Sequence, residues 1–346
     1  MPPKKVIFVR FDKIGDLVST MPMDEICRQL QTKLQIDFKW VISEGLQFLA
    51  DNAVPKREYF TLSLQNNWKN KWKSFWNLVD FFKKENPSLL VIYYAPWWVS
   101  LASWWAGISV RVGRKSQWHS FLFLNKTLRQ SRSQYEKHEA DYNWELTRFA
   151  FEDSLDKENL ETPILVLSPP EQVHLLEKFQ LSSNHYVVVH VGMAGSALNW
   201  TEENYNALIE RLVLKTVVVL TGTESDEPWL KPLRERWFNH PQVRWAQSRF
   251  SIQELLYILK KSYAVVAPST GVSHLAAAAG AKSIGLYSPI LAHHPTRWAA
   301  RGPRARVLLP NVHCSAKKRC LGTKCAQYFC MRNLTPEQVL RSLYDE

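Results

Sequence analysis

The stretch that decides the fold is AVVAPSTGVSHLAAAA, residues 264–279, in which an apolar run is followed by small polar residues. The run at 264–267 predicts a buried strand, and the segment from Val272 to Ala279 predicts a helix that Gly280 closes. A strand that enters a helix through a short turn is one βα unit of a parallel sheet. We therefore expect an α/β protein.

The same alternation recurs along the chain, whose 346 residues favour two domains of ordinary size over one. Strands are expected at 6–9, 38–42, 89–94, 186–191, 216–220, 264–267 and 283–287. Capping residues mark helix starts at Thr201, Ser251 and Thr335. The pattern predicts two Rossmann-like domains whose parallel sheets face each other across a cleft, where open α/β sheets bind ligands.

The domain boundaries follow from these elements and from the proline-punctuated segment between them. We expect an N-terminal domain at 1–165, a C-terminal domain at 166–330, and a helix within 331–346 that packs back toward the N-terminal domain. A helix is expected to run from Asp16 toward Leu30. Large apolar residues recur at helical spacing in one later segment and are predicted to face a core: Trp72, Phe75, Trp76, Val79 and Phe82.

The loop after the first strand carries Arg10, Lys13, Gly15 and Asp16 at the ligand-binding edge of the first sheet. Gly15 lets the backbone approach a substrate closely. Asp16 has two interpretations: a carboxylate that caps the free N–H groups of the following helix, or a general base that takes a proton from a hydroxyl. Arg10 and Lys13 are candidates for binding phosphate, the alternative being ordinary solvated charge.

The turn at 269–274 is the second candidate site. A helix that begins directly after a strand presents free N–H groups and the positive end of its dipole, which together bind anions. Ser269 and Thr270 add hydroxyl donors, Gly271 admits a diphosphate, and His274 reaches the same anion from the first turn. The alternative is a capped helix with a packed histidine. We favour the anion site because cap, glycine and histidine occur together after a buried strand.

Two further loops complete the candidate site. The loop after the strand at 186–191 contains two glycines and Ser196, which suit contact with phosphate or sugar. Glu224, after the next strand, is placed to accept hydrogen bonds from ribose or sugar hydroxyls, or else is a surface carboxylate. Known motifs exclude other classes: the chain lacks G-x-x-x-x-G-K-[ST], H-E-x-x-H, G-x-S-x-G, and G-x-G-x-x-G after the first strand. No D-x-D pair occurs, so a metal-held diphosphate lacks its usual ligands.

The formal net charge of +12 favours an anionic partner: nucleic acid, an acidic membrane surface or a phosphorylated substrate. A tryptophan-rich segment at 97–105 suits a membrane interface, and packing in a domain core is the equal alternative. Its surroundings are interrupted by Pro96, Gly107 and Arg111, so we expect no transmembrane helix. With no secretory signal expected either, we predict a cytoplasmic protein that is at most peripheral on the inner membrane.

Four of the five cysteines cluster near the end of the chain, at Cys314, Cys320, Cys325 and Cys330. Structural disulfides are not expected in a cytosolic chain. Zinc sites usually contain tighter C-x2-C pairs, so we predict no metal and keep a four-cysteine zinc site as the lesser alternative. Because Lys317, Lys318, Arg319 and Lys324 lie between them, reactive free thiols are the other interpretation.

Taken in order, these segments resemble glycosyltransferase family 9, the heptosyltransferases of lipopolysaccharide core assembly. The resemblance spans nearly the whole chain and rests on an ordered set of modest matches: Val6–Arg10, Ile14–Pro22, Arg111–Gly113, Lys137–Glu139, Gly195–Ala197 with Trp200, Gly222–Glu224 and Thr270–Ala277.

The resemblance implies a GT-B fold in which 1–165 binds the acceptor and 166–330 binds the nucleotide sugar. It implies an inverting, metal-independent transfer without a cofactor, typically from ADP-heptose to a lipid-linked glycan. Asp16 matches the proposed base of the family, Thr270, Gly271 and His274 match contacts to the donor phosphates, and Glu224 matches a ribose contact.

The chain departs from the family pattern at two donor positions. Leu198 stands where members often carry lysine, and Ser269 stands where many carry aspartate. Two other functions fit the same architecture: a sugar-nucleotide 2-epimerase, which needs no acceptor, and a non-catalytic anion-binding protein. No RNA-binding signature is present, so nucleic acid is not an expected partner.

Overall fold

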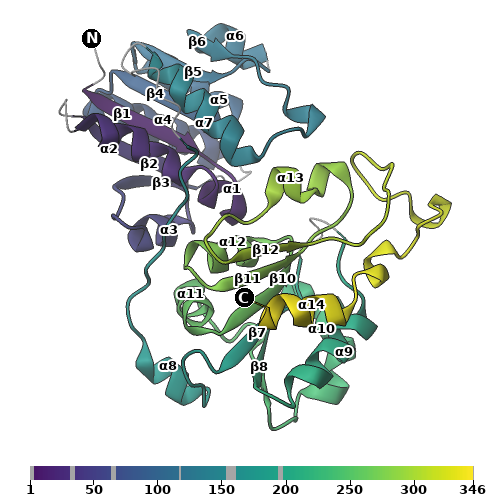
Figure 1. Ribbon diagram of the computed structural model, residues 1–346. Helices are drawn as coiled ribbons and strands as arrows, with labels where there is room; N and C mark the ends of the chain where they lie inside the picture. The colour runs from purple at the N-terminus through teal and green to yellow at the C-terminus, as the bar shows by residue number, and fades with distance from the viewer. Residues whose placement is uncertain are drawn as a thin grey trace. The chain divides into compact units, whose positions relative to one another are not determined.

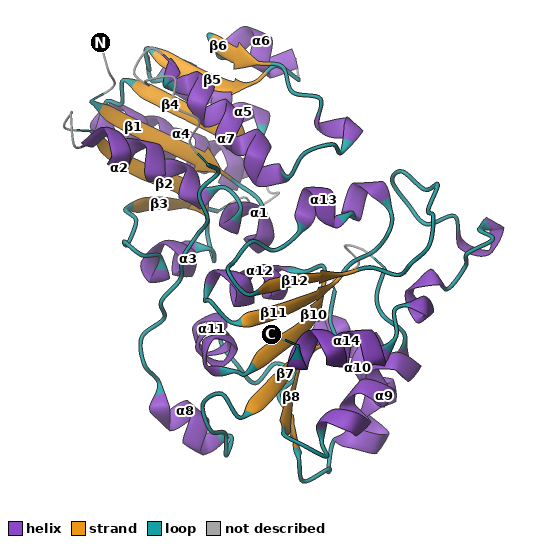
Figure 2. Ribbon diagram, viewed as in Figure 1, coloured by secondary structure: helices purple, strands orange, loops and turns teal. Residues whose placement is uncertain are grey.

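The computed structural model describes residues 4–31, 36–63, 68–116, 118–152, 161–193 and 198–345. The chain divides into two compact units, Met1–Leu165 and Val166–Glu346 (Figure 1). In each unit a sheet of parallel strands lies between layers of helices (Figure 2).

The sheet of the first unit has the strand order β3-β2-β1-β4-β5-β6. Its strands are β1 (Lys5–Arg10), β2 (Asp37–Ser43), β3 (Tyr59–Leu62), β4 (Leu89–Tyr94), β5 (Val110–Arg114) and β6 (Lys126–Leu128). Its helices are α1 (Ile14–Val18), α2 (Glu25–Gln31), α3 (Gln47–Asn52), α4 (Trp68–Glu85), α5 (Trp97–Trp105), α6 (Trp118–Phe123) and α7 (Glu139–Ala150), with short 3-10 turns η1 (Met21–Asp24) and η2 (Arg132–Gln134).

Alternate residues of the central strands point to opposite faces of this sheet, and each face has its own core. Ile7 and Val9 of β1 join the buried faces of α4 and α5. Phe8 points the other way and stacks on Trp40, with ring centroids 5.1 Å apart. On that side Tyr93 donates or accepts a 2.6 Å hydrogen bond with Thr147 of α7. The sheet is therefore buried on both faces, as parallel sheets usually are.

The second unit repeats this topology with the order β12-β11-β10-β7-β8-β9. Its strands are β7 (Tyr186–His190), β8 (Val217–Thr221), β9 (Val243–Trp245), β10 (Ala264–Pro268), β11 (Lys282–Leu286) and β12 (Ala305–Leu308). Its helices are α8 (Val173–Lys178), α9 (Glu202–Leu212), α10 (Glu227–Trp237), α11 (Ile252–Lys261), α12 (Gly271–Ala278), α13 (Pro295–Trp298) and α14 (Pro336–Tyr344), with 3-10 turns η4 (Glu224–Asp226), η5 (Leu291–His293), η6 (Gly322–Lys324) and η7 (Cys330–Asn333).

In both sheets the strand order reverses direction beside the first strand, between β1 and β4 and between β7 and β10. Ligands of open α/β sheets bind outside the carboxyl ends of the strands at such a switch point. The loops after β1, β7 and β10 all leave from these positions, so the topology brings the candidate loops to the functional edge of each sheet. The predicted α/β class with two Rossmann-like parallel sheets is confirmed.

The helix starts predicted from capping residues are confirmed. Thr201 accepts a hydrogen bond from the backbone of Asn204 at the start of α9, and Ser251 and Thr335 form capping boxes at α11 and α14. Helix α14 packs on the core of the second unit, where Val339 and Leu343 are fully buried. The buried residues of this helix thus pack within the second unit, and the expectation that residues 331–346 pack back toward the N-terminal domain stays a prediction.

Two other expectations about the first unit are corrected. The helix expected from Asp16 to Leu30 is split into α1, η1 and α2, because Pro22 lacks the N–H that an uninterrupted helix needs. On α4, the predicted core positions Phe75, Val79 and Phe82 are buried, but Trp72 and Trp76 are each 44% exposed. Within the described ranges, no helix is both long and apolar enough to cross a lipid bilayer.

Candidate functional site

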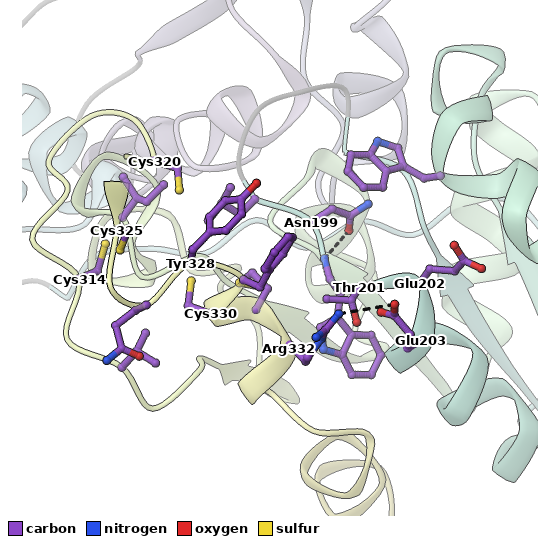
Figure 3. A pocket seen from close by; sticks show the side chains of 18 of the residues that line it. Asn199, Thr201, Glu202, Glu203, Cys314, Cys320, Cys325, Tyr328, Cys330 and Arg332 are labelled. Carbon is purple, nitrogen blue, oxygen red and sulfur yellow. Dashed lines mark hydrogen bonds and ion pairs between the residues drawn. The ribbon is translucent and has the colours of Figure 1, made fainter. Parts of the chain in front are cut away.

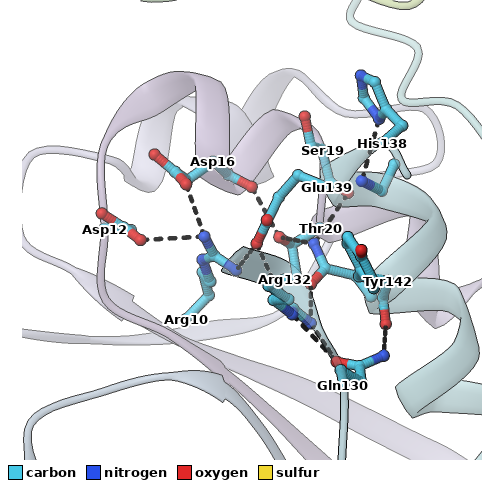
Figure 4. A network of polar contacts seen from close by, with 12 residues as sticks. Arg10, Asp12, Asp16, Ser19, Thr20, Gln130, Arg132, His138, Glu139 and Tyr142 are labelled. Carbon is cyan, nitrogen blue, oxygen red and sulfur yellow. Dashed lines mark hydrogen bonds and ion pairs between the residues drawn. The ribbon is translucent and has the colours of Figure 1, made fainter. Parts of the chain in front are cut away.

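The carboxyl end of β1 carries a buried cluster of charges centred on Arg10 (Figure 4). The guanidinium of Arg10 is only 2% exposed and contacts three carboxylates: Asp16 at 2.7 Å, Asp12 at 3.0 Å and Glu139 at 3.3 Å. Arg132 pairs with the same Glu139 from the far side. Burial opposes the charge of Arg10, but the carboxylates outweigh burial and raise its pKa. Arg10 is thus a fixed cation inside the protein.

Asp16 retains some exposure, 16% of its side chain, as does Asp12 at 23%, whereas Glu139 is only 3% exposed. Burial is the largest influence on it and raises its pKa to about 6, while Arg10 acts in the opposite direction. The neighbouring charges of Asp12 and Glu139 raise it further. A carboxylate with such a pKa is ionised near neutral pH and is a stronger base than an ordinary aspartate, as general-base catalysis requires.

The start of α1 bears on the two interpretations of Asp16. Lys13 occupies the N-cap, and Asp16 lies two residues after Ile14, the first residue of the helix, with its carboxylate on Arg10. The backbone N–H of Lys13 donates instead to Asp12. The N-cap residue makes no side-chain capping hydrogen bond, and the Asp16 carboxylate contacts the Arg10 cation. Lys13 itself is exposed, and Gly15 lies half-buried beside it, as a contact with substrate would require.

The surroundings of Arg10 favour a structural role over its expected contact with phosphate. Its two terminal nitrogens contact three carboxylates of its own unit, and its Nε is buried without a partner among the described residues. The arrangement makes Arg10 a positioning residue for Asp16. Helix α7 supports the same loop, because Asn143 donates to the Thr20 hydroxyl at 2.9 Å and Thr20 donates to the backbone oxygen of Asp16 at 2.7 Å.

In the second unit, the turn at 269–274 connects β10 to α12. Thr270 is the N-cap in an extended conformation, with no side-chain capping hydrogen bond to the helix. Its hydroxyl oxygen is buried and has no partner within the part of the chain that the structure describes. Gly271 begins α12, and the half-buried Ser269 is held by its N–H, which donates to Leu286 at 3.1 Å. A buried hydroxyl without a partner beside free helix N–H groups marks a position for a ligand oxygen.

His274 lies in the first turn of α12 and is 5% exposed. Two hydrogen bonds stabilise the turn: the Ser273 hydroxyl donates to the Thr270 carbonyl at 2.9 Å, and the Ser283 hydroxyl donates to the Ser273 carbonyl at 3.0 Å. These bonds hold the amino end of α12 in one geometry. The anion site expected from the sequence stays a prediction, and its histidine is more enclosed than an open phosphate contact requires.

The loop after β7 begins at His190, whose ring nitrogen Nδ1 is 3.0 Å from the Thr221 hydroxyl. Burial lowers the pKa of His190 to about 4, against a smaller opposite effect of Asp226, so this histidine is neutral near pH 7. At Gly192 an added Cβ would lie 2.2 Å from the carboxylate of Asp226, which explains the glycine. Ser196, the predicted donor contact in this loop, lies outside the described residues.

The loop after β8 carries Glu224, which is exposed at the start of η4. Asp226 closes the turn, because its carboxylate accepts from both the backbone and the hydroxyl of Thr223 at 2.8 and 2.7 Å. The free position of the Glu224 side chain suits a contact with ligand hydroxyls. Asp226, which the sequence analysis did not single out, is instead the structural carboxylate of this loop.

The four clustered cysteines line a cavity of about 470 Å³ beside the loop after β7 (Figure 3). Its other walls include Leu198, Trp229 and the aromatic pair Tyr328 and Phe329, whose ring centroids are 4.0 Å apart. All four cysteines are free thiols. In the described part of the chain, no three His, Cys, Asp or Glu side chains are arranged to hold a metal ion, which leaves the zinc alternative without geometric support.

Two residues of the Arg10 cluster were missed as site residues. Glu139 appeared only as a marker of the family resemblance, and Arg132 was not noticed. Glu139 contacts Arg10 from 129 residues further along the chain, so no local spacing predicts their proximity, and Arg132 joins the cluster through its contact with Glu139. The available signal was the position of Glu139 at the start of a helix in a polar segment, which by itself predicts only a favourable charge near the helix dipole.

Comparison with known proteins gives independent evidence on the fold and the family. Residues 96–325 match the sequence model of glycosyltransferase family 9, described as heptosyltransferase. A Haemophilus influenzae protein provisionally named a glycosyltransferase is 26% identical over 309 residues, which cover 85% of each chain.

Solved structures share the fold over nearly the whole chain. The family 9 glycosyltransferase of Veillonella parvula superposes with a TM-score of 0.78 at 15% identity, covering 99% of this chain and 98% of that one. ADP-heptose lps heptosyltransferase II of E. coli superposes with a TM-score of 0.76 at 17% identity, covering 98% and 97%. E. coli heptosyltransferase WaaC, solved with ADP, gives 0.70 at 17% identity, covering 97% and 98%. The expected GT-B fold is confirmed, and the chain belongs to glycosyltransferase family 9 and is a glycosyltransferase.

Proposed function

We propose that this protein transfers a sugar from a nucleotide-activated donor, ADP-heptose, to a hydroxyl of a lipid-linked glycan, with inversion at the anomeric carbon and without a metal ion. Membership of the family and the ADP in the solved WaaC structure support the class of donor. The observation that carries the proposal is Asp16, a partly exposed carboxylate at the switch point of the first sheet whose pKa is raised to about 6.

The reaction is a single displacement. Asp16 accepts the proton of the acceptor hydroxyl while the oxygen of that hydroxyl attacks the anomeric carbon of the donor sugar. The bond between that carbon and the diphosphate oxygen breaks, and the electron pair leaves with the diphosphate. Lys13 and Gly15 line the acceptor side in this proposal, and Arg10 holds the Asp16 carboxylate from behind.

The leaving diphosphate gains negative charge as the bond breaks, and we assign its stabilisation to the amino end of α12. Backbone N–H groups, the Thr270 hydroxyl and the approach that Gly271 allows supply donors without a cation. Ser196, Ser269 and His274 complete the phosphate contacts, and Glu224 accepts from the ribose. Leu198 and Ser269 replace a cation and an anion of the family pattern together, which keeps the charge of the site balanced.

The acceptor in this proposal is a lipopolysaccharide core or related surface glycan, presented at the cytoplasmic face of an anionic membrane. The net charge of +12 supports such a partner. The protein then acts in the cytoplasm and binds the membrane from outside the bilayer.

The test is an assay of the purified protein with ADP-heptose and a lipid A–Kdo acceptor, read as ADP release and as the mass of the glycosylated acceptor. Transfer by the wild type and its loss in Asp16→Ala are expected. Omission of the acceptor is the control: a change in the donor sugar under that condition, followed by NMR, indicates an isomerase and contradicts the proposal. Transfer by Asp16→Ala at the wild-type rate contradicts the assignment of the base.

A further inference from the structure

We propose that the outer side of α4, α5 and α6 is a docking surface for an anionic lipid bilayer. The surface, called here the aromatic face, consists of exposed side chains on these three helices: Trp72, Trp76, Trp97, Trp104, Trp105, Trp118, Phe121 and Leu122. Each of them is between 44% and 64% exposed. The inference depends on the proposed function in one respect: the surface would serve to bring the enzyme to a lipid-linked acceptor.

Helix α5 is apolar on two sides, and α4 carries exposed tryptophans among the charged residues of its outer side. On α5, Trp98, Val99 and Ala102 pack into the core over the sheet, so the tryptophans at the other positions have no core to enter. On α4, Phe75 and its neighbours at helical spacing fill the same core, and Trp72 and Trp76 point away from it. A surface helix normally presents polar residues on its outer side. The second apolar side therefore calls for a partner outside the unit.

The exposed rings form one continuous surface instead of isolated contacts. Helix α5 contacts both α4 and α6, and the three lie along one part of the first unit (Figure 1). Trp76 of α4 meets Trp105 of α5 with ring centroids 5.8 Å apart. Trp97 of α5 meets Trp118 of α6 at 5.7 Å. A connected aromatic patch on a soluble domain marks an interaction site, whereas single exposed rings are ordinary.

The charge around the aromatic face identifies the partner. Between Glu85 and Glu136 the sequence has no aspartate or glutamate and six lysines or arginines, and no acidic residue occurs between Glu58 and Asp80 either. Lys71 and Lys73 are exposed on α4. The ammonium of Lys115 lies 5.5 Å from the ring of Phe121. Tryptophans that favour the headgroup region, together with uncompensated cations, match an anionic bilayer.

A second copy of the chain fits this face poorly. Two aromatic faces in contact would bring the lysines of both copies together, and the exposed Asp80 of α4 offsets only part of their charge, so like charges would meet across the interface. A bilayer that contains anionic lipid supplies both the apolar depth for the rings and the negative charge for the lysines.

The aromatic face adjoins the edge of the sheet that carries Asp16. Helix α5 begins at Trp97, three residues after the end of β4, and β4 is the neighbour of β1. The backbone N–H of Phe11 donates to Tyr94 at 2.9 Å, and the Arg10 guanidinium lies 5.8 Å from the Tyr94 ring. A bilayer held on this face would present its lipid-linked sugars beside the proposed base.

The test is sedimentation of the full chain with vesicles of phosphatidylcholine alone or with about a third phosphatidylglycerol, at low salt and at about 0.5 M salt. The wild type should bind the anionic vesicles at low salt. The double variant Trp104→Gln, Trp105→Gln should lose affinity by on the order of tenfold. Lys71→Glu with Lys73→Glu should lose about as much. Phe238→Gln is the matched control, since Phe238 in the second unit is equally exposed at 49%.

Melting curves establish that each variant is folded, and transfer to a water-soluble, deacylated acceptor separates this inference from the proposed function. Vesicle binding without transfer contradicts the proposed function and supports the docking surface. Transfer without vesicle binding supports the proposed function and contradicts the docking surface. The docking surface is refuted if the wild type ignores anionic vesicles, if the tryptophan variant binds them as the wild type does, or if that variant abolishes self-association instead of vesicle binding.

Discussion

Replacement of Asp16 by asparagine removes the proposed base while leaving a side chain of the same shape on Arg10. The loss of one positioned general base slows a reaction by roughly 100- to 10,000-fold. We expect Asp16→Asn to lose transfer activity within this range. In the wild type, only the ionised carboxylate accepts a proton, so kcat/KM should fall as the pH decreases through about 6. The variant should lack this acidic limb.

The same substitution has a calculable effect on stability. The pKa of Asp16 is raised from 3.8 to about 6, so the folded protein binds this proton more tightly than the unfolded chain does. The resulting stabilisation is complete below pH 3.8 and is lost as the pH rises through about 6, a difference of about 3 kcal/mol at neutral pH. Asparagine does not titrate. The free energy of unfolding of Asp16→Asn should therefore rise relative to the wild type across this pH window.

The assay combines initial rates of ADP release with urea unfolding of both proteins, each measured from about pH 4.5 to about pH 8. An inactive variant that is at least as stable as the wild type near pH 7.5 is the expected outcome. Activity within tenfold of the wild type would refute the role of Asp16 as base. A variant that becomes less stable relative to the wild type as the pH rises would show that the ion pair with Arg10 outweighs burial, contrary to the reasoning.

Three further substitutions test neighbouring parts of the site. Asp12→Asn removes a negative charge that raises the pKa of Asp16, so the acidic limb of kcat/KM should move to lower pH; a limb that stays in place, or moves up, argues against the coupling. Thr270→Val keeps the shape of the turn but removes the buried hydroxyl, and calorimetric titration with ADP should show binding weaker by about tenfold, with unchanged affinity counting against a phosphate contact. Gly192→Ala places a Cβ against Asp226 and should lower the free energy of unfolding by about 1–3 kcal/mol, whereas an unaltered unfolding midpoint would mean that the loop yields.

The sequence predicts the parts of the fold that depend on local pattern. Apolar runs such as 264–267 and the capping residues Thr201 and Ser251 act through neighbours within a few positions, and the structure has the strands and helix starts that they predict. The sequence predicts less reliably which side of a helix faces the core when large apolar residues occur on more than one side. Trp72 and Phe75 look alike in the sequence, and only the position of the sheet decides which of them is buried.

The candidate site was predictable where it follows strands and hidden where it depends on distant contacts. Asp16 and Thr270 were found because both come directly after a buried strand of a parallel sheet. The role of Glu139 depends on the packing of α7 against β4 and η1, which brings it to Arg10 from 129 residues away, and Arg132 joins the cluster through Glu139. The ion pairs of Arg10 were not predictable for the same reason, since the sequence does not show which distant carboxylates surround a guanidinium.

The charge cluster around Arg10 allows residues that do not contact substrate to change the pKa of Asp16. Glu139 acts on Asp16 at a distance, and it belongs to a helix that begins 123 residues further along the chain. Substitutions around the start of α7 can therefore shift the acidity range in which the base is active without altering any group that contacts donor or acceptor. We expect relatives that work at different pH to vary at Glu139 and Arg132 while the loop that carries Asp16 stays unchanged.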